Sequence, residues 1–429
     1  MRLKKTIFLM LAAFFTLLQA CTADEPMAQQ QDQSPERTTH VSMDQARNRL
    51  AKVLEAMNPS TRSNSLNIGE GVALSKNNKP LTRSGEEDAW YYYFPINDGE
   101  KFAIMSARTD MPELLATGNG TPDKDNPAAL VPDTLRWNIN NVRRSISVPV
   151  DSTWLAENDT VFYERGFTYY YFPYRHLCPV KWNQNYPFNK YIDFDPRIND
   201  IPNAGCVAIA MVHFMAAAKC RPSHYKNIPL DWETWIKYPT VDSLKSHPEA
   251  LDSVAKLLYY LGLKENLDMQ YGYDGYTSVT YDYKIPPTLE NFGFYDGGQI
   301  APFSENAVIH EFDRGYPVII SGSSTKLPIG HTWILDGLMV AETVVKVYNR
   351  KECIGQYTEQ VYYFDVNWGW SGQGDGFYLS TGFNSLVPPD FNPDNNPVNN
   401  SQRPWEPWGA NFDGYKTILV GVKKDSTEK

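Results

Sequence analysis

The chain has 429 residues, of which 42% are hydrophobic and 14% aromatic. This composition is that of a globular protein, not a disordered one, and the length allows two or three domains with a substantial core. The formal net charge of −10 and the lack of a basic stripe argue against nucleic acid as a partner. Glycine loops that cradle phosphate are absent, as are His/Cys clusters with metal-binding spacing, so no cofactor and no metal are expected.

The N-terminus has the pattern of an export signal. Three basic residues precede an apolar stretch from Ile7 to Leu18, which is too short to span a bilayer. The stretch ends in Leu18-Gln19-Ala20-Cys21, which resembles a bacterial lipobox in which Cys21 becomes the lipidated first residue. The alternative is an ordinary cleavage site that happens to precede a cysteine. We therefore predict a signal peptide at 1–20, a lipidated flexible tether at 21–40, and an exported lipoprotein of a bacterial outer membrane, cell-surface bound or released after processing.

The next segment predicts a small α+β unit. Ser42 and Gln45 are spaced as a capping box, and an apolar helical face follows as far as Asn58-Pro59. The turn sequence Asn97-Asp98-Gly99 separates two apolar runs, 90–94 and 102–106, which indicates a β-hairpin. A second amphipathic helix is expected at 133–144.

Cys206 lies directly after Gly205 and opens an apolar run to Ala218 that contains no Gly or Pro. Since glycine permits a tight turn, this pattern predicts a buried helix with a thiol in its first turn. The positive end of the helix dipole favours a thiolate, so the pKa of Cys206 is predicted to fall. Taken alone, the residue is explained equally well as a small side chain packed at a helix start.

Two later segments supply partners for this thiol. His331 opens a strand-like apolar run after Gly330, and Asn367 lies among aromatic residues and glycines. Acyl-transfer chemistry at a cysteine needs a His to take its proton and a group that orients the His ring. The order Cys, His, Asn is the papain-like order. Asp336, five residues after His331, is a weaker candidate for orienting the ring, because strand alternation places it on the opposite face.

These segments resemble the streptopain family of papain-like bacterial cysteine peptidases, which are made as zymogens with an inhibitory propeptide. The resemblance covers about residues 41–429. The matching motifs are Gly205-Cys206-Val207-Ala208, Gly330-His331 with Asp336-Gly337, Val366-Asn367-Trp368-Gly369-Trp370, and Lys181-Trp182-Asn183-Gln184.

The resemblance implies a role for each site residue. Cys206 is the nucleophile and His331 its proton acceptor, while Asn367 holds the His ring and Trp368 shields that hydrogen bond from water. Gln184 supplies the side-chain donor of the oxyanion hole, beside the backbone N–H of Cys206. The implied activity is that of an endopeptidase with a hydrophobic residue preferred two positions before the cut.

The resemblance also implies an α+β architecture. A papain-like catalytic domain at 151–429, with a helical half and an antiparallel sheet or barrel half, follows an α+β inhibitory propeptide at 41–150. The mature enzyme should begin between about Arg143 and Arg175. The implied partners are protein or peptide substrates, the chain's own propeptide as an intramolecular inhibitor, and a membrane through the lipid anchor.

Two features depart from the family pattern. His213 and Phe214 replace a smaller or amide-bearing pair on the nucleophile helix. The loop 387–408 is rich in Asn and Pro where the family tends to be Gly-rich, which puts substrate preference in doubt rather than the chemistry.

The catalytic part is predicted to contain two principal helices and six strands. The helices are Val207–Ala218 and Glu249–Leu261, the latter with Gly262 as its C-cap. The predicted strands are Tyr316–Ser321, Thr332–Leu338, Thr343–Tyr348, Gln360–Asn367, Gly376–Leu379 and Thr417–Val422.

The cysteine count leaves Cys178, Cys220 and Cys353 for structural roles, so at most one disulfide is expected among them.

The sequence leaves three alternatives open, two for the whole chain and one for its N-terminal unit. A papain-like acyl transferase or amidase would use the same Cys-His pair with water excluded. A catalytically inactive, lipid-anchored binding protein would show no thiol reactivity. The N-terminal α+β unit could also be a protein-binding module without an inhibitory role.

Overall fold

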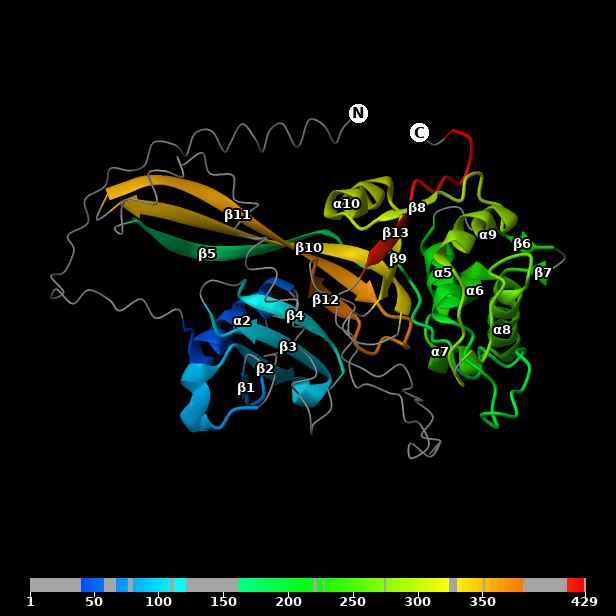
Figure 1. Ribbon diagram of the computed structural model, residues 1–429, viewed down its shortest axis with the longest axis horizontal. Helices are drawn as coiled ribbons and strands as arrows, with labels where there is room; N and C mark the ends of the chain where they lie inside the picture. Colours follow the sequence, from blue (N-terminus) through cyan, green and yellow to red (C-terminus); the bar gives the residue numbers. More distant parts are fainter. Residues whose placement is uncertain are drawn as a thin grey trace. The chain divides into compact units, whose positions relative to one another are not determined.

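A computed structural model describes residues 40–57, 67–75, 80–108, 112–120, 161–218, 222–226, 228–273, 275–323, 330–349, 352–380 and 415–427. These residues form helices around an 11-stranded antiparallel sheet (Figure 1). The main path of the sheet runs β1-β2-β3-β4-β12-β11-β10-β9-β13-β8, and β5 pairs with β10 beside that path. The predicted α+β class is confirmed.

The N-terminal unit consists of one helix and a four-stranded meander. The predicted capping box is present, since Ser42 N donates to Gln45 Oε1 at 3.1 Å and Gln45 N to Ser42 Oγ at 3.3 Å. The predicted hairpin is also present, with its turn at Asn97–Gly99. The elements are α2 (Met43–Met57), β1 (Val72–Leu74), β2 (Tyr91–Ile96), β3 (Lys101–Ser106) and β4 (Leu114–Asn119), with a 3-10 turn, η3, at Arg83–Asp88.

The remaining strands form the part of the sheet that belongs to the predicted catalytic domain. The two predicted strands 332–338 and 343–348 are one long strand, β10 (Gly330–Asn349), paired along its length with β11 (Glu352–Asn367). β5 (Val161–Tyr174), which the sequence reasoning missed, pairs with the second half of β10 (Figure 1). The other strands of this part are β8 (Gln299–Pro302), β9 (Val318–Ser323), β12 (Gly376–Leu379) and β13 (Lys416–Val420).

The helices of this part form a second core against β9, β10 and β13, except α10 (Glu305–Arg314), whose buried residues Val308 and Phe312 belong to the first core. Helix α5 (Cys206–Ala217), which begins with the predicted nucleophile, is buried along almost its whole length, as its uniformly apolar sequence requires. Additional short elements are η6 (Asp282–Lys284) and the two-stranded hairpin of β6 (His224–Tyr225) and β7 (Ile228–Pro229). The other helices are α6 (Trp232–Lys237), α7 (Val241–Lys245), α8 (Pro248–Gly262), α9 (Ile285–Asn291) and α10 (Glu305–Arg314).

Gly262 is not the left-handed cap that the sequence suggested. Helix α8 includes Gly262 and ends at Leu263, whose φ of −59° and ψ of 157° are extended. The glycine is needed for packing, because a Cβ there would lie 1.7 Å from the hydroxyl of Tyr271.

The N-terminal unit joins the catalytic sheet edge to edge. Strand β4 pairs with β12 through Gly118 opposite Gly376, Thr117 opposite Phe377 and Ala116 opposite Tyr378. Glycines permit this approach: a Cβ on Gly376 would lie 2.1 Å from the carbonyl oxygen of Thr117, and one on Gly118 3.0 Å from that of Asp375. The buried apolar residues of the N-terminal unit continue directly into those of β10, β11 and β12.

Several predictions concern residues outside the described part of the chain. They are the signal peptide, the lipobox with Cys21, the tether, the helix at 133–144, the loop 387–408 and Cys220. Within the described residues, no helix is both long and apolar enough to cross a membrane. Cys178 and Cys353 are free thiols, so they do not form a disulfide with each other.

We expect Gly118→Ala to lower the free energy of unfolding by about 1–3 kcal/mol, because its methyl group would overlap backbone oxygens of the 374–375 turn. Urea denaturation of the full-length chain measures the effect. Gly85→Ala is the matched control, since a Cβ at Gly85 meets side-chain atoms at ordinary distances of 3.7 Å and beyond. Equal loss of stability in both variants would contradict the tight β4–β12 approach.

Candidate active site

Cys206 is the first residue of α5, as the sequence predicted. Gly205 before it has a φ of 95°, and a Cβ there would lie 2.8 Å from the Met269 methyl group, so the turn requires glycine. Burial raises the pKa of the Cys206 thiol, and hydrogen bonds from Thr332 and Val207 oppose this effect only in part. The predicted fall in pKa is therefore wrong for this conformation, because desolvation of the sulfur outweighs the helix terminus and these hydrogen bonds.

The segment predicted to provide the oxyanion hole runs beside the turn that precedes Cys206. Gln184 is buried, and its carbonyl oxygen accepts a hydrogen bond of 2.8 Å from the N–H of Ala204, two residues before Cys206. The preceding residue, Asn183, donates from its amide to Ser371 Oγ at 2.8 Å. Backbone and side-chain contacts therefore fix this segment between the turn before α5 and the loop after β11.

The position of His213 explains why this residue departs from the family pattern. Its buried ring lies on α5, and Nε2 accepts a hydrogen bond of 3.2 Å from the backbone N–H of Trp182. Burial lowers the pKa of His213 to about 3, so the ring stays neutral and keeps this acceptor atom. His213 thereby links the nucleophile helix to the Gln184 segment.

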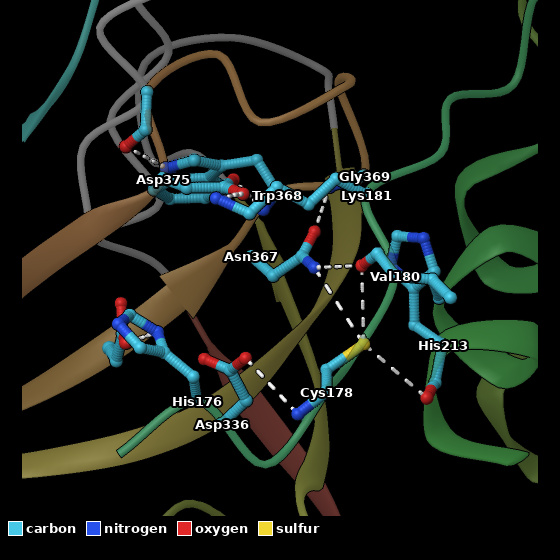
Figure 2. A network of polar contacts seen from close by, with 12 residues as sticks. His176, Cys178, Val180, Lys181, His213, Asp336, Asn367, Trp368, Gly369 and Asp375 are labelled. Carbon is cyan, nitrogen blue, oxygen red and sulfur yellow. Dashed lines mark hydrogen bonds and ion pairs between the residues drawn. The ribbon is translucent and has the colours of Figure 1, made fainter. Parts of the chain in front are cut away.

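The side chain of Asn367 is held by backbone atoms of the same region (Figure 2). Its amide nitrogen donates to the carbonyl oxygen of Val180 at 3.1 Å and lies 3.8 Å from the sulfur of Cys178. Its amide oxygen accepts from the N–H of Gly369 at 3.1 Å. The amide therefore has fixed partners, and none of them is His331.

His331 lies in a cage of indole rings. Its Nε2 makes a hydrogen bond of 2.9 Å with the carbonyl oxygen of Trp368, and its ring centroid lies 5.9 Å from that of Trp333, 6.1 Å from that of Trp368 and 5.0 Å from that of Trp370. Only 8% of the residue is exposed. This burial lowers the pKa of His331 to about 4, so the ring is neutral at pH 7.

Strand alternation places His331 away from the other site residues. Thr332, which hydrogen-bonds the Cys206 sulfur, faces the helical core, so His331 faces the opposite core with Trp333. Asn367 pairs with Ile334 across β10 and β11 and therefore shares the face of Thr332. The predicted hydrogen bond between Asn367 and His331 is absent for this reason: the two side chains lie on opposite faces of the sheet.

Asp336 occupies a β-bulge, since the register of β10 against β11 shifts between Leu335 and Gly337. Its carboxylate accepts a hydrogen bond from the N–H of Cys178 at 3.4 Å (Figure 2), in agreement with the prediction that it is structural.

Sequence reasoning missed two residues at the site. Thr332 hydrogen-bonds the nucleophile, and Asp375 holds the backbone N–H of Trp368 at 3.0 Å. For Asp375 the available signal was an acidic residue between glycines seven positions after Trp368.

Residues 182–378 of the chain match the family described as the Peptidase C10 family. All four predicted motif segments fall within or directly beside this range. This region therefore matches the C10, or streptopain, family, and the resemblance predicted from the motifs is confirmed. A search among curated proteins gives no match.

The chain is also similar to solved structures from Prevotella intermedia. A fragment of prointerpain A is 19% identical, with a TM-score of 0.46, and the match covers 85% of this chain and 100% of that one. The active wild-type cysteine protease interpain A is 20% identical, with a TM-score of 0.38, and the match covers 58% of this chain and 95% of that one.

In the full-length chain, we expect iodoacetamide to alkylate Cys206 slowly at neutral pH and faster as the pH rises, because burial raises the pKa of the thiol and His331 faces away from it. Mass spectrometry measures the rate of modification between about pH 5 and pH 9 in a Cys353→Ser background, which removes an exposed thiol. Rapid alkylation near pH 5, as a thiolate–imidazolium pair would give, is the contradicting result.

Proposed function

We propose that the chain is the lipid-anchored zymogen of a cysteine endopeptidase. The observation that carries the proposal is the joining of the Gln184 segment to the turn before Cys206, through the 2.8 Å hydrogen bond from Ala204 to Gln184, inside the region that matches the C10 family. An oxyanion hole needs a side-chain donor close to the nucleophile, and this backbone hydrogen bond holds the chain at Gln184 next to the turn that precedes Cys206. Thiol chemistry on a peptide carbonyl is the reaction that this arrangement supports best.

In the active form, His331 takes the proton of Cys206, and the thiolate attacks the carbonyl carbon of the scissile peptide bond. The Gln184 amide and the Cys206 N–H stabilise the oxyanion, and one such donor is typically worth roughly 2.7–4 kcal/mol of barrier. The imidazolium of His331 then protonates the leaving amine, and water hydrolyses the acyl-enzyme. Asn367 orients the His331 ring in this form, with Trp368 shielding the contact from water.

The described conformation supports a silenced precursor. The ring of His331 is neutral and bonded to Trp368, so it must leave the indole cage and turn to the face of Thr332 before it can contact Cys206. Asn367 needs a smaller change than His331. It lies on β11, on the same face of the sheet as Thr332, which contacts Cys206.

A chain of hydrogen bonds connects the N-terminal unit to His331 and supports the inhibitory role of that unit. Asn119, at the end of β4, donates to the carbonyl oxygen of Asp375 at 2.9 Å and accepts from the N–H of Gly374 at 3.0 Å. The carboxylate of Asp375 accepts from Trp368 N at 3.0 Å, and the Trp368 carbonyl binds His331. We infer that docking of β4 on β12 stabilises the caged position of His331.

The pairing of β5 places a limit on where the propeptide ends. Val161 to Tyr174 pairs with β10 in the catalytic sheet, so a cut within this strand would remove part of that sheet. Within the expected window from Arg143 to Arg175, we therefore propose cleavage before Val161.

We expect Cys206→Ala in the full-length chain to abolish peptide hydrolysis, labelling by a papain-class epoxide inhibitor and self-maturation together, because all three need the thiol. A fluorogenic peptide, inhibitor mass labelling and gel analysis of processing measure them. Cys353→Ser is the matched control; its thiol is exposed and should be dispensable.

The outcomes separate the competing functions. Normal hydrolysis by the Cys206→Ala chain would overturn the catalytic assignment. Labelling of the unaltered processed protein without any peptide cleavage would favour an acyl transferase or amidase, and no labelling at all would favour an inactive binding protein. The mass of the mature N-terminus, in the same experiment, tests whether cleavage precedes Val161.

Lipid anchoring is proposed from the sequence around Cys21. We expect the unaltered chain to partition with membranes after expression in a bacterial host, and Cys21→Ser to release the chain into the soluble exported fraction because no thiol remains for the lipid. Membrane fractionation and the acylated mass of the N-terminal peptide measure this. Membrane partitioning that survives Cys21→Ser would contradict the anchor.

A further inference from the structure

A second group of ionisable side chains lies outside the proposed catalytic set. It comprises His176 from the segment after β5, Asp336 from β10 and Asp365 from β11. One ligand atom of each, a ring nitrogen or a carboxylate oxygen, lies within 4.8 Å of the other two. Figure 2 shows the His176 ring beside the Asp336 carboxylate, below Asn367. Because the three residues are far apart in sequence, no metal-binding motif in the sequence predicted this cluster.

The backbone is shaped to bring these groups together. The β-bulge places Asp336 outside the regular ladder, and its carbonyl oxygen accepts from the N–H of Leu177 at 2.7 Å, next to His176. Gly337 pairs with Asp365 across the strands, and a Cβ on Gly337 would lie only 2.9 Å from the Cβ of Asp365. A glycine at 337 therefore makes room for the Asp365 side chain at this place.

In this cluster two buried carboxylates face a single imidazole. Asp336 is 4% exposed and Asp365 3% exposed. Nδ1 of His176 lies 2.7 Å from Oδ2 of Asp365, yet this buried oxygen accepts no well-aligned hydrogen bond from the described residues. Buried carboxylates in such a setting need either a proton or a cation.

We propose that His176, Asp336 and Asp365 bind a divalent transition-metal cation of the Zn²⁺ type. One imidazole nitrogen and two carboxylate oxygens are donors that Zn²⁺ accepts in a tetrahedral site, with water in the fourth position. The His176 side chain is 68% exposed, so the site opens to solvent on that side and the ion has a path of entry. Ca²⁺ and Mg²⁺ fit less well, because both prefer sets of oxygen ligands.

A cation here would act as a structural tie close to the catalytic elements. It would join β10 five residues after His331 to β11 two residues before Asn367, and it would fix the start of the segment that leads to Gln184. The Cys178 N–H already contacts Asp336 at 3.4 Å, and the Cys178 sulfur lies 3.8 Å from the Asn367 amide nitrogen. Neutralising the two carboxylates would thus stabilise the backbone on which Asn367 is held.

The test uses the full-length chain with Cys206→Ala and Cys353→Ser, so that neither thiol competes for the metal. Calorimetric titration with ZnCl₂ should show one strong site per chain, and the thermal unfolding midpoint should rise with ZnCl₂. His176→Ala and Asp365→Asn, each added to this background, should weaken binding at least tenfold and remove the rise. Asp365→Asn should still fold without metal, because it deletes a buried charge and keeps the shape of the side chain.

His224→Ala is the matched control, since it removes an exposed imidazole outside the cluster and should leave the Zn²⁺ affinity unchanged. Absence of a strong Zn²⁺ site in the background chain would overturn the proposal. Equal affinity in the background chain, His176→Ala and Asp365→Asn would also overturn it, because the metal would then lie elsewhere. A site that binds CaCl₂ more tightly than ZnCl₂ would overturn the assigned class of metal.

Discussion

The hydrogen bond between Nε2 of His331 and the carbonyl oxygen of Trp368 determines the state of the whole site. It holds the imidazole on the face of β10 that carries Trp333. Thr332 points to the opposite face of the strand, where it hydrogen-bonds the Cys206 sulfur. Because successive residues of a strand point to opposite faces, one residue of β10 cannot serve both sides at once. Under the proposed function, the position of this single ring therefore decides whether His331 can contact the Cys206 sulfur.

Burial explains why neither member of this pair is charged. The sulfur of Cys206 lies at a helix start and receives hydrogen bonds from Thr332 and Val207, all of which favour a thiolate, yet desolvation still raises its pKa. The indole cage lowers the pKa of His331 to about 4 for the same reason. Helix-terminus arguments from sequence assume a solvated thiol. They fail here because the surrounding protein removes water from the sulfur.

Local patterns in the sequence were sufficient for elements whose determinants are close together. The capping box at Ser42, the glycine turn before Cys206 and the strand at 376–379 were predicted from a few adjacent residues. Long-range pairing was not accessible in this way. β5 was missed because its stabilising partners lie in β10, some 170 positions later in the chain. The cluster of His176, Asp336 and Asp365 was missed because three distant segments and a β-bulge create it.

The indole cage and the catalytic ion pair exclude each other. A pKa of about 4 for His331, against an ordinary value of 6.5, corresponds to a preference of the cage for the neutral ring on the order of 3 kcal/mol. Proton transfer from Cys206 makes an imidazolium, which the cage disfavours by that amount. Any conversion that forms the ion pair must therefore move His331 out of the cage. The N-terminal unit is connected to this ring by a chain of hydrogen bonds through Asn119, Asp375 and Trp368. Under the proposed function, removal of that unit would free the 374–375 turn from β4 and would weaken the support of the Trp368 carbonyl without altering Cys206 itself.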